Sequence, residues 1–182
     1  DAVVAITAGT PGMQTVLDLV WEHLLPAMQP APLPADPAAW AVLAHKLAGL
    51  VLPWVEGAGV VSYAGDVSGR RYRFAARRAR LQAISFEFGR EAAAISVEDG
   101  AGLNRFSCGR DGWLCGTTTW NPLGLRLVPD DGHLPIAASG AWTAPDTYEF
   151  RLCYTETPFC LTAVSKFAGG KVTLRLRVNV SF

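Results

Sequence analysis

TLRLRVNV, residues 173–180, alternates polar and apolar side chains without interruption. Successive side chains of a strand point to opposite faces of its sheet. This alternation is therefore typical of an antiparallel sheet with one buried and one solvated face. The same alternation occurs where Tyr72 and Phe74 lie between arginines, and again over residues 84–88. These runs predict strands with one inward apolar face.

Turn-forming dipeptides separate the alternating runs. They are Asp99-Gly100, Asp111-Gly112, Asp131-Gly132 and Gly169-Gly170. Such pairs favour the tight turns of β-hairpins. The spacing predicts about eight to eleven short strands between residues 60 and 182. We therefore predict a mainly β fold, an antiparallel β-barrel or sandwich of lipocalin-like form, preceded by a two-helix segment.

The first 57 residues differ from the rest of the chain in the spacing of their apolar residues. Val3 to Thr7 is apolar and β-branched, which favours a short strand, and Val16, Val20 and Leu24 then recur at helical spacing. Prolines at positions 30, 32 and 34 end that helix. Asp36-Pro37 predicts the start of a second helix, which we expect to end near Pro53. The predicted division is a strand and helix over 1–29, a proline-rich linker and helix over 30–57, and a β-domain over 58–182.

Composition narrows the classes of partner. The chain has 182 residues, half of them apolar, and its formal net charge is zero. A neutral protein has no long-range field to attract phosphate backbones or acidic lipid, so nucleic acid is not an expected partner. No apolar run reaches the roughly 18 residues of a membrane-spanning helix. Because the first residues read as the middle of a sequence, we expect the chain to be a piece or a mature form of a longer protein.

The four cysteines form two pairs with equal spacing. Cys108 and Cys115 flank Asp111-Gly112, and Cys153 and Cys160 flank Glu156-Thr157. A two-residue turn at each place would set the two cysteines opposite each other, within disulfide distance. The alternative is that they are buried free thiols; a zinc site is less favoured by this spacing. Disulfides would imply an oxidising compartment, most simply a bacterial periplasm.

Motifs for catalysis are missing from the sequence. It contains no Ser-x-x-Lys, Gly-x-Ser-x-Gly or His-Glu-x-x-His, and no glycine loop for phosphates or dinucleotides. His23, His45 and His133 read as exposed or capping residues. We therefore predict no catalytic residue, no metal site and no cofactor for this chain.

Two groups of side chains are candidates for ligand binding. The aromatic candidates for a pocket lining are Trp113, Trp120, Trp142 and Tyr148. Core packing is the alternative, since aromatic rings bury large areas without any ligand. The basic candidates are Arg71 and Arg73, within a cluster that also includes Arg70, Arg77, Arg78 and Arg80. An anion site is one interpretation of the cluster, but the alternation favours a solvated face.

Several segments resemble a known family. They are residues 2–10 (AVVAITAGT), 16–27 (VLDLVWEHLLPA), 138–152 (ASGAWTAPDTYEFRL), 156–159 (ETPF) and 179–182 (NVSF). The first two resemble the last strand and C-terminal helix of serine hydrolases of the β-lactamase and penicillin-binding protein type. The others resemble the β-domain appended to many of these enzymes. The resemblance implies an exported parent enzyme, periplasmic or secreted, that hydrolyses an amide or ester.

The family's Ser-x-x-Lys, Tyr-x-Asn and Lys/His-x-Gly motifs have no counterpart in this chain. The resemblance therefore implies a noncatalytic accessory domain that shapes substrate access or assembly, with the parent hydrolase domain as a partner in cis. Val16, Val20 and Leu24 would pack on the β-domain or on a second copy in a homodimer. The alternative function is a barrel that binds a small apolar ligand against Trp113, Trp120 and Trp142. A self-standing enzyme is a third, less favoured, possibility.

Overall fold

A computed structural model describes residues 3–58, 61–75, 81–124 and 132–180. Its residues divide into two units, a helical unit over 10–53 and a β-unit that comprises 3–9 and the described residues from 54 onward.

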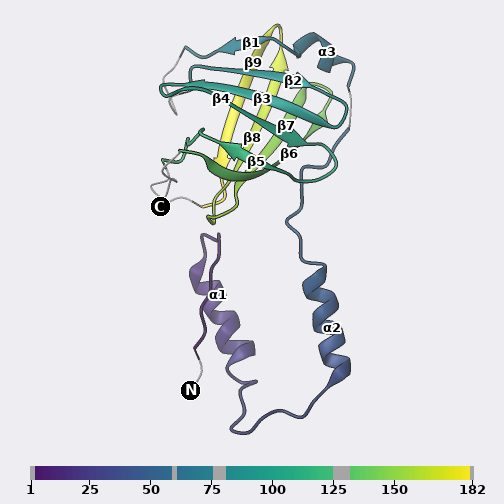
Figure 1. Cartoon of the computed structure of the whole chain (residues 1–182), viewed down its shortest axis with the longest axis vertical. Helices are drawn as coiled ribbons and strands as arrows, with labels where there is room; N and C mark the ends of the chain where they lie inside the picture. Colours follow the sequence, from purple (N-terminus) through teal and green to yellow (C-terminus); the bar gives the residue numbers. More distant parts are fainter. Residues whose placement is uncertain (1–2, 59–60, 76–80, 125–131, 181–182) are drawn as a thin grey trace. The chain divides into compact units, whose positions relative to one another are not determined.

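One mostly antiparallel sheet makes up the β-unit and is nearly closed into a barrel, which confirms the predicted fold class (Figure 1). Its nine strands, within the described residues, are β1 (Arg71–Arg73), β2 (Ala83–Phe88), β3 (Ala92–Asp99), β4 (Gly102–Gly109), β5 (Leu114–Thr118), β6 (Leu134–Ala144), β7 (Thr147–Tyr154), β8 (Cys160–Ala168) and β9 (Lys171–Val178). The strand order is β1-β2-β3-β4-β6-β7-β8-β9, and β5 also pairs with β6.

Aromatic side chains fill the interior of the barrel. Phe167 lies at the centre of one cluster, with its ring centroid 5.4 Å from Phe86, 5.7 Å from Tyr72 and 5.6 Å from Trp142. The apolar residues of the alternating runs point inward, as predicted: Tyr72 is buried between the exposed Arg71 and Arg73. On β9 the inward residues are only half-buried. Period-two alternation has therefore produced one continuous core within the curved sheet.

Two of the predicted hairpins are confirmed. Gly169 and Gly170 connect β8 to β9 with φ values of 54° and 72°, a conformation that favours glycine. At the β3–β4 turn, the Asp99 carboxylate accepts hydrogen bonds from the backbone N–H groups of Ala101 and Gly102. The predicted turn at Asp131-Gly132 includes a residue outside the described ranges.

The predicted hairpin at Asp111-Gly112 is wrong. β4 pairs along its length with β3, whereas β5 pairs with β6, opposing Leu114 to Ala138. Gly109 forms a parallel bridge to Ser139, so the end of β4 and the start of β5 share one edge of β6. β6 is long enough, at 11 residues, to pair with both. A turn signal shows where a chain reverses, but not which strand the next segment joins.

Two short segments complete the β-unit. Residues before β1 extend the edge of β6: the Ala58 N–H donates to the Trp142 carbonyl at 2.9 Å, and the Val55 N–H donates to the Ser139 hydroxyl at 3.1 Å. A short helix that the sequence did not predict, α3 (Tyr63–Val67), follows and buries Ala64 and Val67. The Ser68 hydroxyl after α3 accepts a hydrogen bond from the Phe88 N–H at 3.0 Å.

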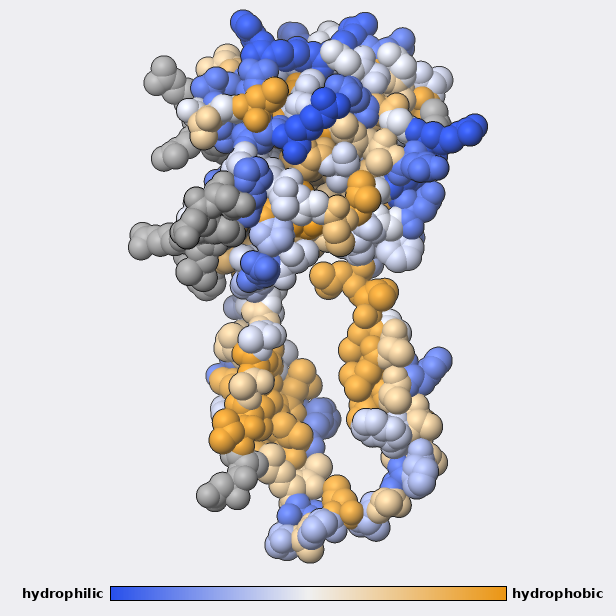
Figure 2. Space-filling model, in the orientation of Figure 1, coloured by the Kyte–Doolittle hydropathy of each residue, from blue (hydrophilic) through white to orange (hydrophobic). Residues whose placement is uncertain are grey.

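The helical unit contains α1 (Met13–Leu19), which continues as the π-helical turn η1 (Val20–Leu24), and α2 (Pro37–Ala48). The Asp36 carboxylate caps α2 by accepting a hydrogen bond from the Ala39 N–H at 2.9 Å, as predicted. α2 ends at Gly49, ahead of the expected Pro53. Figure 2 shows that apolar residues gather along both helices.

The predicted strand over residues 3–7 is wrong. These residues are extended but have no strand assignment, and Val3 is almost fully exposed. A strand needs a neighbour to bond with, and a β-branched sequence alone does not supply one. In the helix that follows, Val16 and Val20 are half-buried and Leu24 is exposed. No residue of α1, η1 or α2 is buried.

Candidate functional site

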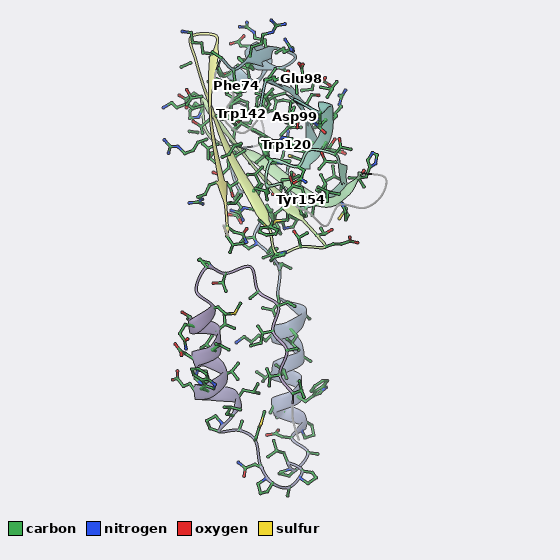
Figure 3. The ribbon with its side chains drawn as sticks, turned by 90° about the vertical axis from the view of Figure 1, so that its left-hand side faces the viewer. Phe74, Glu98, Asp99, Trp120, Trp142 and Tyr154 are labelled. Atoms are coloured by element: carbon green, nitrogen blue, oxygen red, sulfur yellow. A yellow bond between two sulfur atoms is a disulfide. The ribbon has the colours of Figure 1, made fainter. Side chains whose placement is uncertain are left out.

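The four aromatic candidates do not form one pocket. Trp142 and Tyr148 oppose each other on β6 and β7, with ring centroids 5.5 Å apart. Trp120 stacks instead on Phe106 at 5.9 Å, and Trp113 is half-buried. Figure 3 labels Trp142 and Trp120 at different levels of the barrel. Trp120, Trp142 and Tyr148 therefore occupy packed core positions.

A cavity of about 290 Å³ lies at the rim of the barrel, next to Trp142 and Tyr148. Its walls come from α3, the β2–β3 turn, the residue after β4, and the facing parts of β6 and β7. The lining residues are Ala64, Gly65, Ser68, Phe88, Gly89, Ala92, Ala93, Arg110, Gly140, Ala141, Trp142 and Tyr148. We refer to it as the rim cavity.

Small residues create the space and aromatic rings form the apolar wall. Seven of the lining residues are glycine or alanine. The rings of Phe88 and Trp142 approach to 4.9 Å between centroids, and Phe88 and Tyr148 are also 4.9 Å apart. A concave apolar surface with few polar groups is typical of small-molecule sites.

The Tyr148 hydroxyl is the unusual polar group of the rim cavity. Tyr148 is 2% exposed, and its hydroxyl has no hydrogen-bond partner among the described residues. Burial raises the pKa of the phenol well above its ordinary value, the neighbouring Cys108 raises it further, and Arg110 lowers it. The group is therefore a neutral donor without an acceptor, an arrangement that is rare in protein interiors.

Among the described residues, Arg110 supplies the only charge in the lining. Its Nη2 donates to the Gly89 carbonyl at 3.2 Å, and its backbone N–H donates to the Glu91 carbonyl at 3.1 Å. These bonds hold the arginine against the β2–β3 turn. Within the described part of the chain it forms no ion pair, and no aspartate or glutamate lines the rim cavity. Its remaining N–H groups are available to an acceptor.

The two arginine candidates lie away from the rim cavity, on the outer face of β1. Arg71 forms a two-point ion pair with Glu98 of β3. The hydrogen bond between them raises the pKa of Arg71 and lowers that of Glu98. Arg73 is exposed nearby, and Arg77, Arg78 and Arg80 lie outside the described residues. This arrangement fits the solvated-face interpretation, because a nearby carboxylate already neutralises Arg71.

One predicted disulfide is confirmed and the other is wrong. Cys153 and Cys160 are opposed on β7 and β8, with Cα atoms 4.1 Å apart, and form a disulfide. Cys108 and Cys115 are free thiols. Cys108 opposes Ala93 and is buried, whereas Cys115 opposes Ala137 and is exposed. They fail to meet because β5 pairs with β6 rather than with β4.

The rest of the described chain offers weaker candidates. A second hollow of about 730 Å³ is bordered by the β3–β4 turn and residues from 119–124, but the only ionisable side chain among its described lining residues, Asp99, already caps that turn. The described residues contain no group of three or more histidine, cysteine, aspartate or glutamate side chains placed to hold a metal ion.

Sequence reasoning found Trp142 and Tyr148 but missed Arg110, Ser68 and the small residues around them. Arg110 directly precedes the Asp111-Gly112 turn signal, and nothing in its local sequence indicates a binding role. No signal in the sequence joins α3 to the end of β4, since only tertiary packing brings these segments together.

Comparisons with known proteins return no match. No family model, no curated protein and no solved structure matches the chain. Among the described residues, no helix has both the length and the apolar character needed to cross a membrane.

Proposed function

We propose that the chain is a noncatalytic β-domain of a larger serine hydrolase, and that its helical unit packs against the rest of that enzyme. The observation that carries the proposal is the exposure of the helical unit, in which no helix buries a residue. Its exposed large apolar side chains include Met13, Leu17, Leu19, Trp21, Leu24, Leu25, Met28, Leu33, Trp40, Val42, Leu43, Leu47, Leu50, Val51 and Leu52.

The apolar residues of α2 are not confined to one stripe. Trp40, Leu43 and Leu47 share one side of the helix by their spacing, whereas Val42 falls on the opposite side. Trp40 is 67% exposed and Val42 is 70% exposed. His45 and Lys46 share the side of Val42, so α2 has a polar side, and its wide apolar side needs another surface to cover it. Exposed apolar patches of this kind mark surfaces that another protein covers.

The disulfide between Cys153 and Cys160 supports an exported location for this enzyme. Disulfides persist in oxidising compartments and are rare where thiols are kept reduced.

The docking can be tested with fluorinated tryptophan. The isolated chain is compared by ¹⁹F NMR with a product that also contains the residues encoded upstream of Asp1. We expect the Trp21 and Trp40 signals to lose their accessibility to a soluble paramagnetic quencher in the longer product. The buried Trp142 serves as the internal control, because its signal should be protected in both. Equal quenching of Trp40 in the two products would contradict the docking.

The noncatalytic role has its own test. The isolated chain should not hydrolyse p-nitrophenyl butyrate or nitrocefin, and a Ser-x-x-Lys should be encoded within the few hundred residues upstream. Hydrolysis that co-purifies with the chain and is abolished by a substitution within it would disprove this role.

A second function, binding of a small molecule, is favoured by a different observation. The rim cavity of about 290 Å³ holds Arg110, which has no ion pair among the described residues, beside an apolar wall. This volume is at the lower end of the range for ligand pockets. Most of the barrel interior is filled by its own aromatic rings, so a ligand would be held at the rim rather than in a central lumen.

A further inference from the structure

We propose that the rim cavity binds a small organic acid, with its carboxylate at Arg110 and an aryl or branched aliphatic body against Trp142 and Phe88. The proposal rests on the second function above, which it deepens by naming the class of ligand.

The charge of the ligand follows from the lining. Arg110 is the only formally charged residue among the twelve that line the rim cavity, and it forms no ion pair with the described residues. Its contact with the Gly89 carbonyl uses only one of its five N–H donors. A guanidinium presents its donors in a planar fork that matches a carboxylate. A cationic ligand would meet repulsion here without any carboxylate to offset it.

The Tyr148 hydroxyl is not a second donor to the ligand. It lies close to Gly140, which lines the cavity, but it has less than 1 Å² of accessible surface. A ligand oxygen therefore cannot reach it, and Arg110 is the charged donor that the described lining offers to an anion.

The apolar part of the ligand is inferred from the aromatic wall of the cavity. The half-buried Phe88 presents most of the ring surface, since Trp142 and Tyr148 are each 2% exposed, and the remaining described walls are mostly glycine and alanine. Such walls cannot satisfy the polar groups of a sugar or a nucleotide. A volume of about 290 Å³ admits a single ring or a short branched chain.

The test uses phenylacetate and its uncharged analogue phenylacetamide as probes with the full chain. Binding is followed by ¹H–¹⁵N NMR at the Trp142 indole N–H and the Arg110 Nε–H, which localise it to the rim cavity. We expect saturable binding of phenylacetate, with a dissociation constant on the order of 1 mM. Phenylacetamide should bind roughly tenfold more weakly, because it loses a charge-assisted hydrogen bond.

Three variants make the test specific. Arg110→Gln should weaken phenylacetate binding roughly tenfold and abolish the preference over the amide. Arg90→Gln is the matched control: it removes the same charge from the exposed β2–β3 turn, outside the cavity lining, and should change nothing. Gly65→Leu should weaken both probes, because Gly65 lines the cavity and a β-carbon there has no atom within 4 Å, so we expect the larger side chain to occupy cavity space without a clash.

The outcomes distinguish binding in the rim cavity from placement of the ligand's carboxylate at Arg110. Saturable shifts at Trp142 would show that the cavity binds the probes. If those shifts show no preference for phenylacetate over phenylacetamide, or are unaffected by Arg110→Gln, the assignment of the carboxylate to Arg110 is overturned. Absence of probe-induced shifts at both Trp142 and Arg110, up to about 20 mM probe, would overturn the binding function together with the assignment.

Discussion

The ring of Tyr148 lies against the α-carbon of Gly140. A β-carbon placed on Gly140 would stand 2.8 Å from Cζ of Tyr148, closer than real β-carbons approach other atoms, and 3.1 Å from the Glu149 carbonyl oxygen, which is tighter than most real contacts. Gly140 belongs to β6 and Tyr148 to the adjacent β7. A missing side chain on one strand thus makes room for the phenol of its neighbour.

Gly140→Ala should therefore destabilise the β-unit. The added methyl meets the Glu149 carbonyl, and this backbone group cannot move without breaking strand pairing. We therefore expect a loss of about 1–3 kcal/mol in the free energy of unfolding. Urea denaturation measures it. Gly116→Ala in β5 is the control, because a β-carbon there has no atom within 4 Å. Equal stabilities of the two variants would rule out the steric role of Gly140.

Tyr148 and Tyr154 should respond differently to loss of the hydroxyl. The Tyr154 hydroxyl donates to the Trp120 carbonyl at 2.9 Å, so Tyr154→Phe should cost about 1 kcal/mol of stability. The Tyr148 hydroxyl has no partner, so Tyr148→Phe should leave stability unchanged or raise it. Denaturation of the two single variants beside the unmodified chain gives the comparison. A larger loss for Tyr148→Phe would show that its hydroxyl is bonded in solution.

Thiol counting should distinguish the four cysteines. In the folded chain only Cys115 should react with Ellman's reagent, because Cys108 is buried. After denaturation without reductant, Cys108 and Cys115 should both react, because Cys153 and Cys160 are joined in a disulfide. Burial also raises the pKa of the Cys108 thiol, which suppresses the reactive thiolate. Cys115→Ser should leave no reactive thiol in the folded chain. Four thiols in the denatured, unreduced chain would contradict the Cys153–Cys160 disulfide.

The β-unit should lose stability in alkali. Burial raises the pKa values of Cys108, Tyr148 and Tyr154 above their ordinary values of 9.0 for cysteine and 10.0 for tyrosine. Below pH 9 these groups are neutral in both the folded and the unfolded state, so stability is fully present. As the pH rises further, the unfolded chain ionises first, and each group then lowers the free energy of unfolding by about 1.4 kcal/mol per pH unit.

Urea denaturation between pH 7 and 11 measures this dependence. Cys108→Ala should move the onset of the loss from near pH 9 to near pH 10, because only the tyrosines remain. A stability that is constant up to pH 11 would show that these side chains are accessible to water in the folded state.

Much of the fold could be predicted from local patterns. Alternation placed Tyr72 inside and Arg71 outside because neighbouring side chains of a strand must face opposite ways. Asp36 before Pro37 predicted the start of α2, since a carboxylate can accept from the first free N–H groups of a helix. Cys153 and Cys160 were correctly paired because their hairpin is a local structure.

The rim cavity could not be predicted in this way. It joins Gly65, Arg110 and Tyr148, which are far apart in the sequence and meet only when the sheet curls. Of these, Tyr148 was singled out as an aromatic residue, but its unpartnered hydroxyl depends on what surrounds it.

The sequence by itself determined the alternating strands β1, β2 and β9, their inward faces and the capped start of α2, because each depends on residues that are neighbours along the chain. Only the tertiary structure decided that β5 pairs with β6, that Cys108 is buried while Cys115 is exposed, and that Arg110 borders a cavity. Strand pairing is chosen by the packing energy of the whole barrel, and that energy is not encoded in any single stretch of residues.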